Sequence, residues 1–192
     1  MSALELAHQL KQPFGDLLSG PTEFRGEVTL QLAEAERIAE ICAHAKQQLG
    51  FDYLVDISSV DNYGEDPRWE LVYELCGMAH RAYLRLKTKV SEEKSELPTV
   101  TGVWRTADWH EREIYDMMGI RFRGHPDLRR ILMWEGYPYF PLRKDFPLAG
   151  KSTDLPDVAF SRPAPLEGGP FVTLPGGKDA VDREPRVRTP EI

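Results

Sequence analysis

The sequence predicts an α+β fold, in which a two-layer domain with a mixed, mostly antiparallel sheet and a few helices precedes an extended, proline-rich C-terminal tail. Three observations support this prediction. Four segments in the first half of the chain alternate apolar and polar side chains, the period of a half-buried strand, and two segments have helical spacing. After residue 133 neither period continues, and ten of the fifteen prolines follow. We therefore predict a domain at 1–133 and a tail at 134–192.

The first strand and the first helix are predicted at 28–32 and 33–49. In the strand segment every second side chain is apolar. In the helix segment apolar side chains recur at i, i+3, i+4 and i+7 as far as Leu49. Gly50 stands where a left-handed C-terminal cap belongs, so we expect the helix to end there.

Three further alternating segments are predicted as strands at 51–57, 69–75 and 81–87. The connections between them are short, which favours an antiparallel meander over crossover connections. One helix packed against such a sheet gives a two-layer α+β domain.

A second helix is predicted to begin at Asp108 and to end at Gly119. Asp108 is a favourable N-cap residue, and Glu111 follows it at the spacing of a capping box. Arg112 and Asp116 lie four residues apart on the polar face and are expected to form an intrahelical ion pair. Gly119 is the expected C-terminal cap.

Glu111 falls within the apolar arc of this helix. A buried carboxylate without a partner would be destabilising by several kcal/mol. We expect Glu111 either to close the capping box or to meet a buried cation, for which Arg129 or Arg130 is the natural partner.

The predicted tail is unusually aromatic for a linker. Its seven aromatic residues are Trp134, Tyr137, Tyr139, Phe140, Phe146, Phe160 and Phe171. A disordered segment has little use for such side chains, whereas a segment that lies across a partner does. We expect residues 134–171 to dock on a partner and the chain to be flexible after about residue 174.

Composition excludes several classes of function. With 31 acidic residues against 24 Lys and Arg, the net charge of −7 argues against a nucleic-acid binder. Cys42 and Cys76 lie far apart and lack metal-site spacing, so we expect neither a metal nor an iron–sulfur cluster held by this chain. No run of 18 apolar residues occurs, so we expect a cytosolic, reduced chain without a direct membrane span.

The charge reverses sign locally between residues 121 and 145, where six Lys and Arg face three acids. With His125 nearby, this stretch could hold a general acid–base pair or a metal, but no HExxH, DxD or nucleophile motif accompanies it. It could also grip RNA, although the acidic remainder would repel the phosphate backbone. The interpretation that the residues favour is an interaction subunit, whose charges set the register against a large neighbour while aromatic anchors supply affinity.

The same stretch resembles a known family. The run EREIYDMMGIRFRGHPDLRRIL at 111–132, followed by WEGY at 134–137 and PLRKDFPL at 141–148, is similar to the signature of the 30 kDa (C-type) subunit of respiratory complex I, the NADH:quinone oxidoreductase. The resemblance extends from about residue 28 to 148. The sequence PYF at 138–140 departs from the family pattern and is expected to bulge the chain there.

The resemblance implies a non-catalytic structural subunit in the hydrophilic arm of a proton-translocating NADH:quinone oxidoreductase. No cofactor is expected on this chain, while FMN, iron–sulfur clusters and quinone belong to the assembly. The implied partners are the 49 kDa-type (D-type) subunit and the cluster-carrying subunits of B and I type. The implied location is peripheral, on the cytoplasmic side of the cell inner membrane. The equivalent subunit of a membrane-bound hydrogenase or of another quinone-linked dehydrogenase, or a stand-alone metal-dependent hydrolase, remains an alternative.

No catalytic, cofactor-binding or metal-ligating residue is expected in the chain. By analogy with the family, interface roles are expected for nine residues: Glu111, Arg112, Glu113, Asp116, His125, Arg129, Arg143, Lys144 and Asp145.

Overall fold

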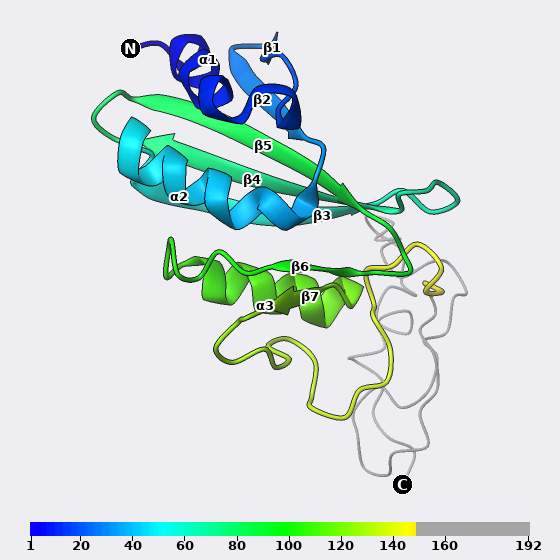
Figure 1. The fold of residues 1–192 in the computed structure, drawn as a ribbon. Helices are drawn as coiled ribbons and strands as arrows, with labels where there is room; N and C mark the ends of the chain where they lie inside the picture. Colours follow the sequence, from blue (N-terminus) through cyan, green and yellow to red (C-terminus); the bar gives the residue numbers. More distant parts are fainter. Residues whose placement is uncertain (149–192) are drawn as a thin grey trace, which may run out of the picture. The chain divides into compact units, whose positions relative to one another are not determined.

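A five-stranded mixed sheet lies at the centre of the computed structural model, which describes residues 1–148 (Figure 1). The strand order is β1-β2-β5-β4-β3, and only β2 and β5 run parallel. The strands are β1 (Thr22–Phe24), β2 (Glu27–Leu32), β3 (Tyr53–Asp61), β4 (Trp69–Gly77) and β5 (Ala82–Val90). The predicted mixed, mostly antiparallel sheet is confirmed. This fold belongs to the unit Met1–Arg143; a second unit begins at Lys144.

Strands β3, β4 and β5 form the predicted antiparallel meander. Alternation explains their pairing, because the inward-facing side chains of β5, such as Leu84 and Leu86, are fully buried while Tyr83 is exposed. A bulge between Leu54 and Asp56 shifts the register of β3.

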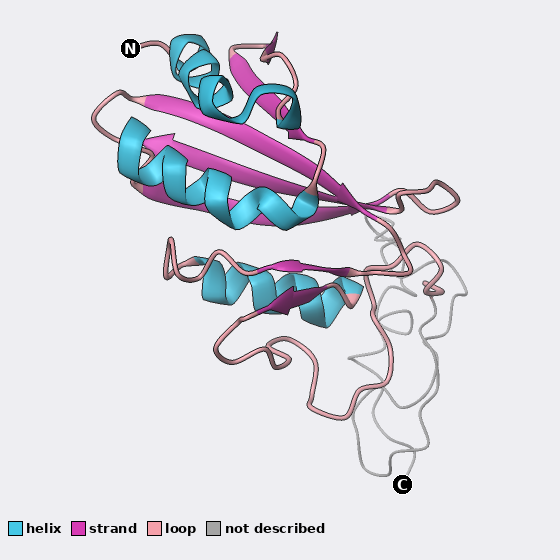
Figure 2. Ribbon diagram, viewed as in Figure 1, coloured by secondary structure: helices cyan, strands magenta, loops and turns pink. Residues whose placement is uncertain are grey.

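Helices α1 (Ala3–Phe14) and α2 (Ile38–Leu49) lie on one face of the sheet (Figure 2). The predicted start of α2 was too early, because a short 3₁₀ turn at Ala35–Arg37 precedes the helix. Gly50 caps α2 in the left-handed conformation, as predicted. Helix α1 was not predicted, although its Ser2–Glu5 capping box is visible in the sequence.

The third helix, α3 (Ala107–Met118), packs against β3 and lies beside two short parallel strands, β6 (Glu96–Pro98) and β7 (Arg121–Arg123) (Figure 1). Strands of three residues carry too little alternation to be predicted. Gly119 ends α3 as expected, at φ +78°. The predicted capping box is wrong: the N-cap residue is Thr106, and no side chain caps the helix there.

The three layers share one apolar core. Ile114 and Met117 of α3 belong to the same buried cluster as Leu71 of β4 and Ile41 of α2. This core fixes α3 on the sheet, so the polar side chains along its other face have defined positions. Among the described residues no helix is both long and apolar enough to cross a bilayer. The part of the predicted tail beyond residue 148 lies outside the described residues.

Candidate interaction site around the third helix

Asp116, near the end of α3, binds the segment that follows β7. Its carboxylate is fully buried, and Oδ2 accepts hydrogen bonds from the backbone N–H groups of Ile131, Leu132 and Met133 at 3.0, 2.7 and 2.8 Å. Oδ1 accepts one from Nη1 of Arg130 at 2.5 Å. Burial raises the pKa of this carboxyl, but the four hydrogen bonds outweigh burial and hold the pKa below its ordinary value. Asp116 therefore stays ionised and fixes this segment to the helix.

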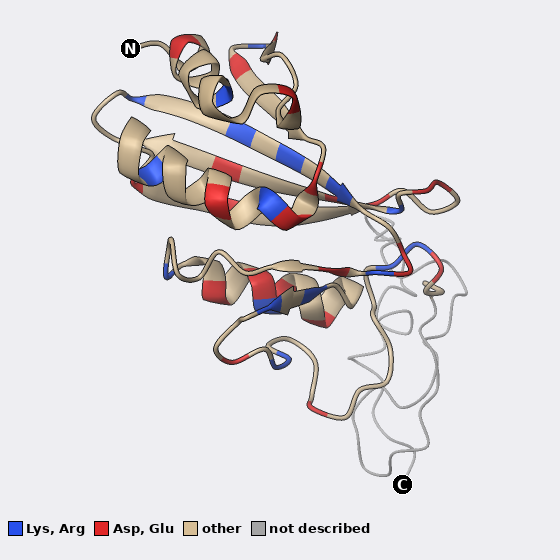
Figure 3. Cartoon of the chain, in the orientation of Figure 1, with Lys and Arg blue, Asp and Glu red and all other residues tan. Residues whose placement is uncertain are grey.

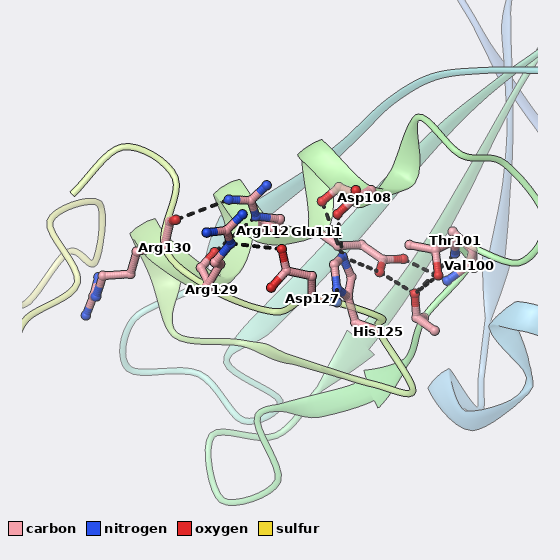
Figure 4. Close-up of polar contacts among 10 residues, drawn as sticks. Val100, Thr101, Asp108, Glu111, Arg112, His125, Asp127, Arg129 and Arg130 are labelled. Atoms are coloured by element: carbon pink, nitrogen blue, oxygen red, sulfur yellow. Dashed lines mark hydrogen bonds and ion pairs between the residues drawn. The ribbon is translucent and has the colours of Figure 1, made fainter. Parts of the chain in front are cut away.

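Arg112 supports the same segment one turn earlier (Figure 4). Its Nε and Nη2 donate to the backbone carbonyls of Arg129 and Arg130 at 3.2 and 3.3 Å, and its guanidinium lies 5.3 Å from the ring centroid of Trp109. The predicted intrahelical pair with Asp116 is wrong, because Asp116 binds Arg130 and Arg112 binds carbonyl groups. Only 8% of Arg112 is exposed.

Arg130 links the segment to the aromatic residues that follow it. Its Nη2 donates to the carbonyl of Tyr139 at 3.1 Å. The same guanidinium lies 5.7 Å from the ring centroid of Tyr137 and 5.1 Å from that of Phe140. These cation–π contacts, each worth about 0.5–2 kcal/mol, hold the WEGYPYF stretch near the end of α3.

Gly119 allows the chain to close over the end of α3. A Cβ atom at this position would lie 2.8 Å from Phe140 Cε2 and also too close to the guanidinium of Arg143. Arg143 donates from Nε to the carbonyl of Met118 at 2.6 Å. Glycine is therefore required here twice, for its positive φ and for its missing side chain.

Replacing Gly119 by alanine is expected to lower the free energy of unfolding by at least about 2 kcal/mol. The left-handed conformation alone is destabilising by about 1–2 kcal/mol for alanine, and Phe140 and Arg143 must also move. Urea denaturation of the full-length chain measures the change. Gly124→Ala is the matched control, because Gly124 also has positive φ but its nearest neighbour would lie 3.5 Å away. Equal losses in the two variants would contradict the packing role of Gly119.

Glu111 occupies a second buried polar cluster on α3 (Figure 4). Its carboxylate is fully buried; Oε1 accepts a hydrogen bond from the N–H of Val100 at 2.7 Å and Oε2 one from the hydroxyl of Thr99 at 2.5 Å. His125 Nε2 lies 3.9 Å from Oε2. Both expectations for Glu111 are therefore wrong, since its partners are neither the capping box nor an arginine. The segment before the helix supplies them instead.

Burial raises the pKa of Glu111 to about 7, although the hydrogen bonds from Thr99 and Val100 act in the opposite direction. The folded chain therefore binds this proton more tightly than the unfolded chain does. As a result, the contribution of Glu111 to the free energy of unfolding falls as pH rises from about 4.5 to about 7, and it is constant above that.

Glu111→Gln is expected to remove this slope and to raise stability at pH 8 on the order of 1–2 kcal/mol relative to the unsubstituted chain, because an uncharged amide avoids the burial penalty. Denaturation curves at several pH values measure the difference. A variant less stable than the unsubstituted chain at both acidic and alkaline pH would show that the ionised carboxylate is required.

The remaining predicted residues differ in exposure. Glu113 is exposed, and Arg129, with 64% of its side chain exposed, pairs with Asp127 at 2.8 Å. Figure 3 shows these charges on α3 and on the segment after β7. Lys144 and Asp145 belong to the second unit and are exposed. The structure thus brings Glu111 and His125 together, and separately joins Asp116 and Arg112 to one segment.

Two positions with clear structural roles were missed. Thr99 was not considered, and Arg130 was considered only as a partner of Glu111. The repeated polar pair Thr99 and Thr101 just before a helix was the available signal, because such hydroxyls often bind nearby backbone and carboxylate groups. Within residues 1–148 no group of three or more His, Cys, Asp or Glu side chains could hold a metal ion.

Comparison with known proteins identifies the relatives of the chain. A family model described as "Respiratory-chain NADH dehydrogenase, 30 Kd subunit" matches residues 32–152. A C-type subunit of the NADH-quinone oxidoreductase of Rhizobium meliloti, the one numbered 2, is 52% identical over 134 residues, which cover 69% of this chain and 73% of that protein. The C-type subunit of the same enzyme from Geobacter sulfurreducens is 43% identical over 143 residues, which cover 74% of this chain and 88% of that protein.

Two solved structures share the fold. A trypsin-resistant fragment (1–134) of Nqo5 is 34% identical with a TM-score of 0.56, and the match covers 64% of this chain and 98% of the fragment. A chain of an archaeal membrane-bound sulfane sulfur reductase has a TM-score of 0.66 at 22% identity, covering 75% of this chain and 85% of that chain. At that identity the second likeness shows the fold alone.

Proposed function

Because the chain belongs to the respiratory-chain NADH dehydrogenase 30 Kd subunit family, we propose that it acts as a non-catalytic structural subunit of a proton-translocating NADH-quinone oxidoreductase. It braces the subunits that carry the terminal iron–sulfur clusters and the quinone site. In this role its own side chains transfer no electrons. They keep neighbouring subunits at fixed separations.

The observation that supports this role most directly is the way in which α3 holds the segment after β7. Asp116 uses both carboxylate oxygens to bind that segment, and Arg112 binds its carbonyl groups. A loop fixed by these hydrogen bonds loses little conformational entropy when a partner binds it, and this favours a preformed docking surface. The buried ions therefore act on the interface through the segment they hold.

Direct contacts with partners are assigned to the exposed residues of the same region. Trp109 and Leu132, 59% and 62% exposed, are large apolar side chains of the kind that anchor protein interfaces. Glu113 and Arg129 supply charge at the rim, which sets orientation more than affinity. By the family relationship, the partners are the 49 kDa-type subunit and the cluster-carrying subunits of B and I type, and the location is peripheral, on the cytoplasmic face of the inner membrane.

Native purification tests the proposal. The full-length chain, tagged at its own locus, is expected to copurify with a large assembly that contains flavin and iron–sulfur clusters and reduces quinone with NADH. Recovery of the chain alone under the same mild conditions would contradict membership of an assembly. Nickel with hydrogenase activity in the recovered particle would instead support the related hydrogenase subunit. Stoichiometric metal retained by the isolated chain after dialysis would favour a hydrolase.

A further inference from the structure

Glu111 and His125 face each other in a site closed to solvent. Both side chains have 0% exposure, and their nearest polar atoms, Glu111 Oε2 and His125 Nε2, lie 3.9 Å apart. They come from different elements, α3 and the segment after β7. Two titratable groups held this close out of water affect each other's protonation, because a charge on either one changes the free energy of the charge on the other.

The hydrogen bonds of His125 assign its protonation state. Nδ1 accepts the backbone N–H of Asp127 at 3.0 Å, so this nitrogen carries no proton in the observed geometry. The proton of the neutral ring is therefore on Nε2, which lies 3.3 Å from the carbonyl oxygen of Asp108 and 3.2 Å from its Oδ1. Protonating Nδ1 would set one N–H donor against another and break the bond to Asp127.

The surroundings of the pair are defined on every side. Asp108, whose side chain is 36% exposed, lies between the ring and solvent. Thr99 donates to Glu111 from the segment before α3. On the core side, Cys42 of α2 and Tyr73 of β4 are buried near enough for the charge of Glu111 to raise the pKa of each. The basic side chain that faces Glu111 is His125.

We propose that Glu111 and His125 form one proton-binding site that holds a single proton on either the carboxyl or the ring, exchanges it with water past Asp108, and controls the turn at 125–129. With the proton on Glu111, His125 is neutral and the turn is closed, as observed. With the proton on the ring, Glu111 is ionised, and the N–H of Asp127 loses its acceptor. Both states contain the same atoms and the same total charge.

The turn transmits the position of the proton to the segment held by α3. Asp127 receives the N–H of Arg129 Nε at 2.8 Å, and the carbonyl of Arg129 accepts from Arg112. Opening of the 125–129 turn therefore loosens the start of the segment that Asp116 holds at its other end. This device is independent of the proposed function, because it needs only the contacts within the chain.

Nuclear magnetic resonance of the full-length chain tests the proposal by following the Glu111 carboxyl carbon and the His125 ring nitrogens over about pH 5–9, the range in which coupled groups of this kind titrate. Both residues are expected to report the same midpoints. In Glu111→Gln the His125 midpoint is expected to fall by about one pH unit, since a neighbouring carboxylate favours the charged ring. The amide of Asp127 is expected to exchange faster as the ring takes its proton.

Glu113→Gln is the matched control, because it removes a carboxylate from the same helix at an exposed position and is expected to leave the His125 midpoint unchanged. Three results would each overturn the proposal: a Glu111 carboxyl that titrates in the ordinary range of acids, a His125 midpoint insensitive to Glu111→Gln, or unchanged exchange at Asp127. If Glu111→Gln does not fold, the titration of the unsubstituted chain alone decides.

Discussion

Replacing Asp116 by asparagine is expected to lower the free energy of unfolding of the full-length chain by about 3–5 kcal/mol, the range measured when one member of a buried ion pair is removed. The carboxylate has 0% exposure and accepts four hydrogen bonds. An asparagine amide places an N–H₂ donor either against the three backbone N–H groups or against Arg130. Neither orientation satisfies the site, and Arg130, with 12% of its side chain exposed, is left without its anion.

The pH dependence of this contribution has a definite sign. Because the folded chain holds the pKa of Asp116 below its ordinary value, the stabilisation is fully present above that ordinary value and is lost as pH falls through the folded pKa. The difference between the unsubstituted chain and Asp116→Asn is therefore expected to be constant near neutral pH and to shrink in strong acid. Urea denaturation at a series of pH values measures it.

Asp127→Asn is the control for Asp116→Asn. It makes the same chemical change in an ion pair whose side chains are 55% and 64% exposed, and such pairs contribute about 0–1 kcal/mol. Amide exchange should separate the two variants further, since the N–H groups of residues 131–133 lose protection only when Asp116 is changed. Comparable stability losses in the two variants would contradict the central place given to Asp116.

The second large effect is expected in assembly. Reversing two exposed charges of the proposed docking region, Arg129→Glu together with Lys144→Glu, is expected to reduce the amount of chain in the native complex about tenfold or more, because like charges set against a partner are destabilising by several kcal/mol. The isolated variant should remain folded, since the side chains of both residues are exposed. Blue-native electrophoresis of membranes and quinone reduction with NADH measure the loss.

Arg143 is left out of this variant for a structural reason. Its guanidinium binds the carbonyl of Met118 and lies 4.4 Å from the ring centroid of Phe140, so reversing its charge would damage the fold as well. The control is Arg25→Glu with Lys89→Glu, which reverses two exposed charges on the β1–β2 turn and on β5, outside the proposed docking region. Normal assembly of Arg129→Glu/Lys144→Glu, or equal loss in the control, would refute the docking role.

The part of the fold predicted from sequence is the part with a strong local period. Strands β3, β4 and β5 alternate over nine residues each, so one face is buried and the register is defined. The end of α3 was predicted for a similar reason, because the left-handed conformation at Gly119 favours glycine. The short strands β6 and β7 carry no such pattern and were missed.

The partners of the charged residues could not be predicted in the same way. The spacing of Arg112 and Asp116 fits an intrahelical pair, but Asp116 instead binds groups 14 to 17 residues away. The tertiary position of the segment after β7 decides between these arrangements, and no local spacing encodes it. Glu111 was rightly placed in the apolar arc, yet its partners Thr99 and Val100 belong to a segment without periodic structure.

A structure of the native assembly containing this chain tests the central claim most directly. We expect Asp116 and Arg112 to keep their partners within the chain while Trp109, Leu132 and Arg129 contact neighbouring subunits. An assembly in which the carboxylate of Asp116 leaves the segment to bind a neighbour, or in which the exposed face of α3 is covered by no subunit, would contradict this claim.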